Sequence, residues 1–309
     1  MTKHAWVFPG QGSQSVGMLA DMADKFPQVK QTFDRASSVL GYDLWEVVQN
    51  DPDQTLSQTH ITQPALLAAS YAIYKVLEAH KVDLPDYMAG HSLGEYSALV
   101  CAGVIKFEDG IQLVQARGRF MQQAVPEGVG AMYAIIGLAD DIVKTCCHQA
   151  ETETGLIVCA VNFNSPGQVV IAGNTEAADK AAQLCKAAGA KRALSLAVSV
   201  PSHCALMQPA AEMLASMLDS IDFCPPKVPI INNVDVALQS APEEIKQALI
   251  KQLYSPVRWT ESVQKLASLG INQIYEIGPG KVLTGLIKRI DKSLSCEALN
   301  TADSISVFN

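Results

Sequence analysis

One pentapeptide constrains the fold of this chain more than any other stretch: Gly90-His91-Ser92-Leu93-Gly94. The residues directly before it, Tyr87–Ala89, predict a short apolar strand. The residues after it, Glu95–Ala102, predict a helix that ends before Gly103. A GxSxG sequence between a strand and a helix is typical of a nucleophile elbow, a sharp turn that exposes a serine at the top of a sheet. We therefore predict an α/β protein in which Ser92 is a nucleophile.

The two glycines of this pentapeptide have a steric reason. At a sharp strand-to-helix turn the backbone segments come so close that a larger side chain at Gly90 or Gly94 would block the turn. The same turn places Ser92 at a helix N-terminus, where free N–H groups and the helix dipole stabilise negative charge on an attacked carbonyl. A chance pentapeptide in an ordinary turn is the alternative, and the flanking strand and helix argue against it.

The composition excludes several classes of protein. The chain has 309 residues, a formal net charge of -8 and 49% hydrophobic residues, as expected for a globular enzyme with one or two cores. A negative chain without clusters of lysine and arginine does not favour nucleic acid as a partner. No apolar run suits a membrane span or a signal peptide, so we expect a cytoplasmic location. The spacing of the eight cysteines predicts reduced, buried thiols and no metal site.

A loop rich in glycine and glutamine follows the first predicted strand, Trp6–Phe8. Its sequence, residues 9–17, fits neither common nucleotide-binding motif. Ser15 stands where a dinucleotide fingerprint needs its third glycine, and Met18 stands where a P-loop needs lysine. What remains is a flexible loop whose backbone N–H groups can point at an anion or at a developing oxyanion.

A serine nucleophile needs a base, and His203 is the best placed of the six histidines. It lies where a new helix is expected to start, and apolar residues follow it at intervals of three and four. We therefore expect His203 to lie at the start of the buried face of this helix. A core histidine with a satisfied hydrogen bond is the alternative. His91 is a rival, but its ring should point elsewhere because it directly precedes Ser92 on a tight turn. No obvious acid completes a triad, and a backbone carbonyl or a side-chain amide can fix the imidazole tautomer instead.

The pattern changes over residues 129–198, which predict a small inserted subdomain. Strands and helices follow there in the order βαββαβ, which is typical of a ferredoxin-like module that forms one wall of a cleft. The expected strands are Ala131–Ile136, Leu156–Val161, Gln168–Ala172 and Lys191–Val198, and the expected helices are Asp140–Ala150 and Thr175–Ala188.

Residues 1–128 and 199–309 predict one discontinuous, larger domain. Its alternating strands and helices imply a mostly parallel sheet with helices on both faces, and they place Ser92 and the Gln11 loop at the carboxyl ends of their strands. The other expected helices are Gln63–Leu77, Pro242–Leu253 and Val257–Leu269, and the other expected strands are Val228–Ile231 and Asn272–Ile277.

Five motifs follow one another along the chain. They are Phe8-Pro9-Gly10-Gln11-Gly12-Ser13-Gln14, Gly90-His91-Ser92-Leu93-Gly94-Glu95, Arg117, Ser202-His203 and Gly278-Pro279-Gly280. Together they resemble the bacterial malonyl-CoA:acyl carrier protein transacylases over nearly the whole chain. One motif would carry little weight, but five in the right order are specific. The resemblance implies an α/β-hydrolase-like large domain with a ferredoxin-like insert, in agreement with the pattern above.

The resemblance also implies a role for each site residue. Ser92 is the nucleophile and His203 is the general base. The backbone N–H groups of Gln11 and Leu93 form the oxyanion hole. The main-chain carbonyl of Gln252 orients the histidine in place of a carboxylate, which would explain the missing acid.

Arg117 matches the arginine that holds the malonyl carboxylate in this family. A guanidinium makes two parallel hydrogen bonds to a planar carboxylate, so it can discriminate malonyl from acetyl. Without the resemblance, Arg117 and Arg119 are equal candidates, and each could be a surface arginine on a helix. Ser202 resembles the pattern of methylmalonyl-specific domains of polyketide synthases, but freestanding malonyl enzymes also commonly carry serine there.

The resemblance implies one reaction and two substrates. Malonyl moves from malonyl-CoA to the phosphopantetheine thiol of acyl carrier protein through a malonyl-serine, in a ping-pong cycle that supplies fatty acid biosynthesis, and no further cofactor is expected. A serine thioesterase or hydrolase is the alternative, which would share Ser92 and His203 but need no carboxylate clamp. A scaffold that only docks carrier protein is a third reading, and the intact Ser92 and His203 argue against it.

Carrier proteins of this kind are acidic, so docking to a negative chain requires local positive groups near the mouth of the cleft. No nucleic-acid or membrane partner is expected, and a monomer is favoured. Five basic residues are candidates for the docking surface: Lys191, Arg192, Lys281, Lys288 and Arg289.

Overall fold

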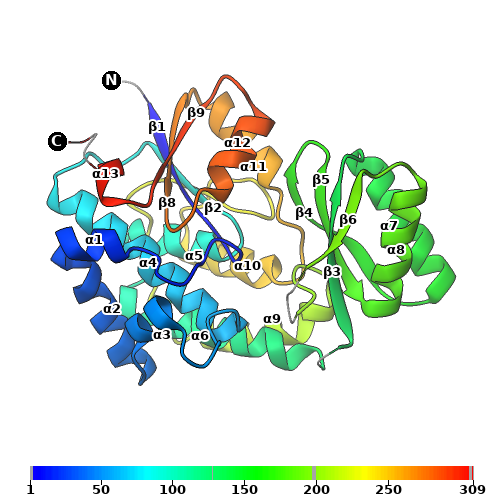
Figure 1. The fold of residues 1–309 in the computed structure, drawn as a ribbon, viewed down its shortest axis with the longest axis horizontal. Coiled ribbons are helices and arrows are strands. Elements are labelled where there is room, and N and C mark those ends of the chain that lie inside the picture. The colour runs from blue at the N-terminus through cyan, green and yellow to red at the C-terminus, as the bar shows by residue number, and fades with distance from the viewer. Residues whose placement is uncertain (1–2, 127, 197–199, 306–307, 309) are drawn as a thin grey trace.

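The computed structural model of the chain describes residues 3–126, 128–196, 200–305 and 308. Figure 1 shows two sheets that lie side by side, each covered by helices. The first sheet has five strands, namely β1 (His4–Phe8), β2 (Tyr87–Gly90), β7 (Ile230–Ile231), β8 (Gln273–Ile277) and β9 (Ser295–Leu299), in the order β7-β2-β1-β8-β9. The chain is thus a mixed α/β protein with a parallel sheet, as predicted.

All pairings in the first sheet are parallel. Phe8 is paired with Gly90, so β1 and β2 end at the same edge of the sheet, and β8 ends beside them. Successive β1 residues alternate between two buried clusters: Trp6 packs on one side, and Ala5 and Val7 on the other. A parallel sheet that is buried on both faces explains why its strands read as continuous apolar runs.

Helices cover both faces of this sheet (Figure 1). One face packs against most of them and the other against the last two long helices. The first group is α1 (Ala20–Lys25), α2 (Pro27–Leu40), α3 (Leu44–Asn50), α4 (Thr59–Ala79), α5 (Leu93–Cys101), α6 (Phe107–Ala124), α9 (Gln208–Leu218) and α10 (Pro242–Gln252), and the second is α11 (Trp259–Ser268) and α12 (Val282–Ile290).

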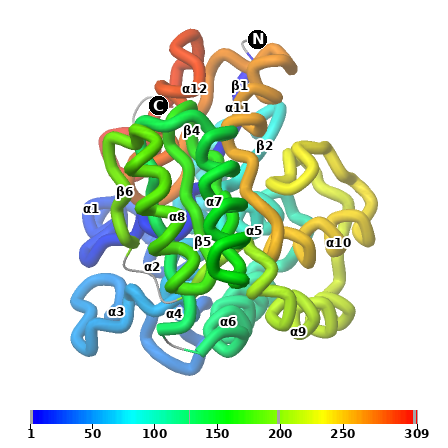
Figure 2. The backbone as a smooth tube through the Cα atoms, turned by 90° about the vertical axis from the view of Figure 1, so that its right-hand side faces the viewer, coloured from blue at the N-terminus to red at the C-terminus, as the bar shows by residue number. Residues whose placement is uncertain are grey.

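The second sheet is antiparallel and has the strand order β4-β5-β3-β6. In Figure 2 its two helices lie on the face of the sheet that points away from the first sheet, and an apolar cluster fills the space between them. The elements, in chain order, are β3 (Gly130–Ile136), α7 (Asp140–Thr154), β4 (Val158–Ser165), β5 (Gln168–Asn174), α8 (Thr175–Ala187) and β6 (Arg192–Ser195).

Several predicted bounds differ from the observed ones. Strand β4 starts two residues after the predicted Leu156 and continues to Ser165, because irregular pairing with β5 keeps polar residues in the ladder. Helix α4 starts at Thr59 instead of Gln63, because its first turn is polar and lacks the apolar spacing. Strand β7 is only Ile230–Ile231. The fourth predicted strand of the insert is observed as β6, and its residues 197 and 198 lie outside the described residues.

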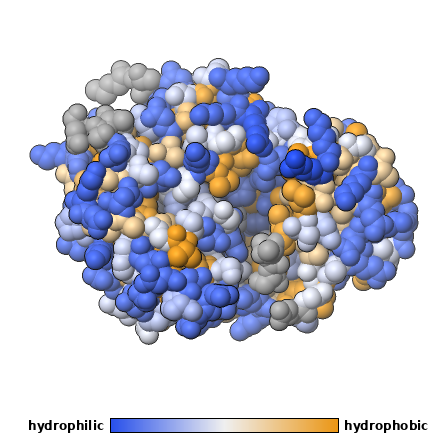
Figure 3. Space-filling model, in the orientation of Figure 1, coloured by the Kyte–Doolittle hydropathy of each residue, from blue (hydrophilic) through white to orange (hydrophobic). Residues whose placement is uncertain are grey.

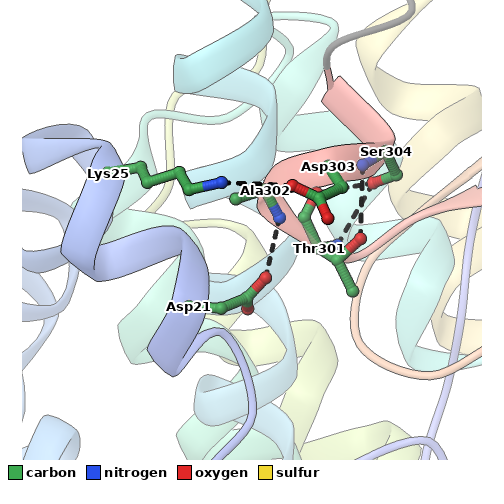
Figure 4. A network of polar contacts seen from close by, with 6 residues as sticks. All are labelled: Asp21, Lys25, Thr301, Ala302, Asp303 and Ser304. Atoms are coloured by element: carbon green, nitrogen blue, oxygen red, sulfur yellow. Dashed lines mark hydrogen bonds and ion pairs between the residues drawn. The ribbon is translucent and has the colours of Figure 1, made fainter.

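The end of the chain packs beside α1 through the short helix α13 (Ala302–Ile305) (Figure 4). The backbone N–H of Ala302 donates to Asp21 Oδ2 at 2.8 Å. Lys25 Nζ lies 3.1 Å from Asp303 Oδ1, but both side chains are largely exposed, so this ion pair adds little stability.

In the part of the chain that the structure describes, no helix has the length and apolar character to cross a membrane. All eight cysteines are free thiols, and six of them are buried. Among the described residues, no group of three or more His, Cys, Asp or Glu is arranged to hold a metal ion.

Candidate active site

The elbow that carries Ser92 joins the end of β2 to the start of α5. Ser92 has φ 52° and ψ -107°, a conformation that an L-residue adopts only when its surroundings enforce it. A Cβ atom on Gly90 would lie 1.9 Å from the backbone carbon of Gly94, and one on Gly94 would lie 2.0 Å from the carbonyl oxygen of Phe8. The steric reason predicted for both glycines is therefore confirmed.

The structure brings His203 to this serine. Ser92 Oγ lies 2.8 Å from His203 Nε2, and His203 Nδ1 lies 2.7 Å from the carbonyl oxygen of Gln252. Because a carbonyl only accepts, Nδ1 carries the proton and donates to Gln252, which leaves Nε2 free to accept the Ser92 hydroxyl proton. A main-chain carbonyl thus occupies the place that a triad gives to a carboxylate.

His203 is a buried side chain in a turn before the short 3-10 helix Ala205–Met207, so the helix begins two residues later than predicted. Burial first, and then the positive charge of Arg117, lower the pKa of His203 to about 3. The imidazole is therefore neutral near neutral pH, which is the state that a general base requires.

The rival histidine is engaged elsewhere. His91 Nε2 lies 2.8 Å from Asn164 Oδ1, and its ring packs 5.6 Å from that of Trp259. Burial lowers the pKa of His91. The structure thus assigns the hydrogen bond with Ser92 Oγ to His203 and not to His91.

Ser92 opens into a cavity of about 310 Å³ between the two sheets, which we call the Ser92 cavity. Figure 3 shows the surface hollowed between the two parts of the molecule. All the site residues predicted from sequence line it except Gln252, which lies directly behind. The lining residues include Gln11, Ser92, Leu93, Arg117, Met132, Asn162, Leu196, Ser202 and His203.

Two residues that line the Ser92 cavity, Gln11 and Leu93, are candidates to supply backbone N–H groups to it. Gln11 belongs to the loop after β1, and Leu93 is the first residue of α5. Neither amide donates to an acceptor among the residues that the structure describes. Free N–H groups beside a nucleophile can hold an oxyanion, and the helix dipole adds to this at Leu93.

Arg117 reaches the same cavity from α6, while Arg119 is exposed on that helix. The Arg117 side chain is 1% exposed. Its Nη1 donates to Gln63 Oε1 at 2.8 Å, and its Nη2 lies 3.0 Å from Gln252 Oε1 and 3.3 Å from Ser92 Oγ. These acceptors are all uncharged, and burial lowers the pKa of Arg117. A buried guanidinium without a contacting carboxylate is a site for an anionic group.

Three polar groups near Ser92 were not predicted. Asn233 Oδ1 accepts from the Ser92 N–H at 2.7 Å. The Gln252 side chain donates to the Ser92 carbonyl at 3.1 Å. Glu95 Oε2 accepts from both of these residues. Only Glu95 had a sequence signal, since it stands three residues after Ser92, whereas Asn233 and the Gln252 amide reach Ser92 only through the fold.

These groups together suit one kind of chemistry. A serine with a neutral histidine base can form an ester, free amides can hold the oxyanion, and a buried arginine selects an acyl group with a negative charge. The site thus defines an acyltransferase or an esterase of charged acyl groups, and comparison with known proteins separates the two.

The acyl transferase domain family matches residues 5–306 of the chain. A malonyl CoA-acyl carrier protein transacylase of Haemophilus influenzae is 60% identical over 307 residues, which cover 99% of this chain and 98% of the relative. The crystal structure of an acyl carrier protein S-malonyltransferase from Vibrio cholerae is 59% identical, with a TM-score of 0.97 and full coverage of both chains. A type II PKS acyl-carrier protein in complex with its malonyl-transacylase is equally similar, with a TM-score of 0.97, 58% identity and 99% coverage of both chains. The chain belongs to the malonyl CoA-acyl carrier protein transacylase family.

Proposed function

We propose that this protein transfers malonyl from malonyl-CoA to acyl carrier protein through a malonyl ester on Ser92. One observation carries the proposal: Arg117 Nη2 lies 3.3 Å from the same Ser92 oxygen that lies 2.8 Å from His203 Nε2. A malonyl group has its carboxylate only two carbon–carbon bonds from its thioester carbonyl carbon. One bound group can therefore reach the nucleophile and the guanidinium together.

The first half-reaction acylates the serine. His203 Nε2 takes the Ser92 proton as Oγ attacks the malonyl thioester carbonyl. The oxyanion that forms is held by the N–H groups of Gln11 and Leu93. The C–S bond then breaks, and coenzyme A leaves as a thiol with the proton from His203.

The second half-reaction reverses these steps with a different thiol. His203 removes the proton of the phosphopantetheine thiol on acyl carrier protein, and the thiolate attacks the malonyl-Ser92 ester. The ester C–O bond breaks and Ser92 regains the proton, while the malonyl group stays on the carrier. Throughout both steps Gln252 keeps the His203 tautomer fixed through the hydrogen bond to Nδ1.

A serine hydrolase of uncharged substrates shares the serine and histidine but gains nothing from a buried arginine at the nucleophile. Burying a guanidinium that no carboxylate contacts is costly, and a bound anion would offset this cost. A scaffold that only docks carrier protein needs no short contact between Ser92 and His203. Arg117 therefore favours malonyl transfer over both alternatives.

For the partner, we propose docking over basic residues of α12 and of the neighbouring antiparallel sheet, together with residues just before these elements. Lys191, Arg192, Lys281, Lys288 and Arg289 are all exposed. Arg289 Nη1 donates to Gln168 Oε1 at 2.7 Å, which links α12 to β5. Gln168 pairs with Ile136, which in turn pairs with Arg192, so cations of both parts lie together. An acidic carrier would be steered to such a patch in spite of the negative net charge.

We also propose two structural units for this function. The strand order β4-β5-β3-β6, with α7 and α8 on one face, supports a ferredoxin-like subdomain over residues 129–198. The parallel sheet and its helices support an α/β-hydrolase-like domain over residues 1–128 and 199–309. A cytoplasmic location and the lack of a further cofactor are parts of the proposal, since both substrates bring their own reactive groups.

The direct test is intact mass after brief mixing with malonyl-CoA or acetyl-CoA. We expect a malonyl adduct on the wild type, no adduct on Ser92→Ala, and a selective loss of malonyl relative to acetyl on Arg117→Ala. Free acid and free coenzyme A without an adduct would favour the hydrolase. If neither an adduct nor turnover appears, the transferase proposal fails.

A further inference from the structure

Glu95 is a buried carboxyl group that the acyl-transfer steps do not require. It lies in the first turn of α5, three residues after Ser92, and its side chain is 3% exposed. A carboxyl group is rarely buried so fully without partners that use it. Its partners here are two residues that hold the nucleophile.

One oxygen of Glu95 joins these two residues. Glu95 Oε2 accepts from Gln252 Nε2 at 2.9 Å and from the backbone N–H of Asn233 at 3.0 Å. Asn233 accepts from the Ser92 N–H, and Gln252 donates to the Ser92 carbonyl. Both backbone polar groups of Ser92 are therefore held by residues that Glu95 fixes.

Gln252 extends this arrangement to the other reacting groups. Its Oε1 accepts from Arg117 Nη2 at 3.0 Å, and its carbonyl accepts from His203 Nδ1 at 2.7 Å. Gln252 is the last residue of α10, so both contacts depend on the position of one helix end. Glu95 is thus one hydrogen bond away from the residue that contacts the nucleophile, the base and the arginine.

We propose that Glu95 is the positioning residue of this site, which holds Gln252 and Asn233 in place and places its charge beside the Arg117 anion clamp. The inference rests on the proposed malonyl transfer and deepens it. It predicts that Glu95 affects both the rate of Ser92 acylation and the preference for malonyl over acetyl.

The ionisation of Glu95 predicts how the preference for malonyl over acetyl changes with pH. Burial raises the pKa of Glu95 to about 7. The hydrogen bonds from Gln252 and Asn233 and the positive charge of Arg117 oppose this rise, because each of them lowers the pKa. Arg117 on α6 and Asp235 after β7 are the charged groups that face it. A malonyl carboxylate on Arg117 is repelled by ionised Glu95 and not by its protonated form. The preference for malonyl over acetyl should therefore fall as pH rises through about 7, because acetyl has no carboxylate for ionised Glu95 to repel.

Two substitutions separate the hydrogen bonds from the charge. Glu95→Gln keeps an acceptor oxygen for Gln252 and Asn233 but removes the charge, and Glu95→Ala removes both. Glu276→Gln is the matched control, because Glu276 is fully buried in β8 and accepts from Leu283 and Thr284 N–H groups. It supports the start of α12 and has no contact with the Ser92 network.

The readout is kcat/KM for Ser92 acylation by malonyl-CoA and by acetyl-CoA, from about pH 6 to about pH 9. We expect Glu95→Ala to lower both values by about 10- to 100-fold, the usual effect of losing hydrogen bonds to a charged group. Glu95→Gln should retain malonylation within a few-fold at the acid end, with a malonyl-to-acetyl ratio that no longer changes with pH. Glu276→Gln should keep the wild-type ratio at every pH.

The outcomes distinguish this inference from the proposed function. If wild type forms malonyl-Ser92 but its malonyl-to-acetyl ratio is flat with pH, the charge role is wrong. If Glu95→Ala and Glu95→Gln behave like Glu276→Gln, the positioning role is wrong. If wild type forms no malonyl adduct, the proposed function itself fails. Should Glu95→Ala not fold, the pH profile of Glu95→Gln decides.

Discussion

At the scale of single residues, Gln252 offers the candidate base His203 a neutral carbonyl at the position where a catalytic triad has a carboxylate. Its carbonyl fixes the His203 tautomer, while its side-chain amide contacts Arg117 and Ser92. A carboxylate in the same position would directly contact the guanidinium that we propose binds the malonyl carboxylate. A neutral carbonyl orients the base without competing for the guanidinium.

The pH dependence of malonylation follows from the buried base. Since the pKa of His203 is lowered to about 3, the imidazole stays in its basic form well below its ordinary pKa of 6.5. We expect the single-turnover rate of Ser92 malonylation not to fall when the pH is lowered from about 7.5 to about 5.5. Stopped-flow acylation with malonyl-CoA measures it. A fall with an apparent pKa near 6.5 would show that His203 titrates like an exposed histidine.

Arg117→Lys tests the geometry of the clamp while it keeps the positive charge. A lysine cannot bond Gln63, Gln252 and a carboxylate at once in the fork geometry of a guanidinium. We expect kcat/KM for malonyl-CoA to fall by about 10- to 100-fold, because charge-assisted hydrogen bonds are lost. The acetyl-CoA value should change by only a few-fold. Equal losses for both substrates would mean that Arg117 supports Ser92 rather than malonyl.

At the scale of elements, the site depends on close approach of the segments that leave neighbouring strands. The Gln11 loop follows β1 and the elbow follows β2, and Phe8 and Gly90 are paired at the ends of these strands. Gly94 packs against the backbone of Phe8, so α5 starts directly above β1. This contact brings the elbow, which carries Leu93, next to the start of the loop that carries Gln11.

Gly94→Ala should destabilise the fold, because its Cβ would lie 2.0 Å from a backbone oxygen that cannot move without shifting β1. We expect a loss of about 2 to 4 kcal/mol in the free energy of unfolding, at the upper end for overpacking. Gly285→Ala in α12 is the control, since a Cβ there meets nothing within 4 Å and alanine favours a helix. Urea unfolding measures both, and equal midpoints would contradict the steric argument.

At the scale of the whole molecule, the Ser92 cavity belongs to neither sheet alone. Ser92, Arg117 and His203 come from the part built on the parallel sheet, whereas Met132 and Asn162 come from the antiparallel sheet. The backbone of Phe163 bonds that of Val257, which ties the two sheets together beside the site.

Charge reversal tests the proposed docking surface. We expect the double variant Lys288→Glu, Arg289→Glu to lower kcat/KM for holo-carrier protein about tenfold or more at low salt, because steering depends on local charge. Malonylation of Ser92 by malonyl-CoA should be unchanged. Lys30→Glu is the control, since Lys30 is exposed on α2, a helix that lies at the lower left of Figure 1, away from α12. Equal loss in both half-reactions would count against a docking role.

Local sequence patterns were enough to predict much of this protein. The elbow around Ser92, the strand before it and most helices with long apolar stripes are local features, because strand and helix periodicities depend on neighbouring residues. The predicted bounds of helices and strands were wrong where polar residues continue an element, as at the start of α4 and the end of β4. The site roles of Gln11, Arg117 and Gln252 came from resemblance to a family, and not from pattern.

Only the tertiary structure decided which distant groups meet at Ser92. Asn233 and Gln252 lie 141 and 160 residues further along the chain, yet each bonds the Ser92 backbone. Residue pattern alone did not separate Arg117 from Arg119, whereas the packing of α6 buries the first side chain and exposes the second. The sequence by itself thus determined the elbow around Ser92, most of the elements that present it, and His203 as the candidate base. The tertiary structure decided how the candidate base and clamp meet at Ser92 and which hydrogen bonds hold them, because these contacts depend on strand order and helix packing rather than on neighbouring residues.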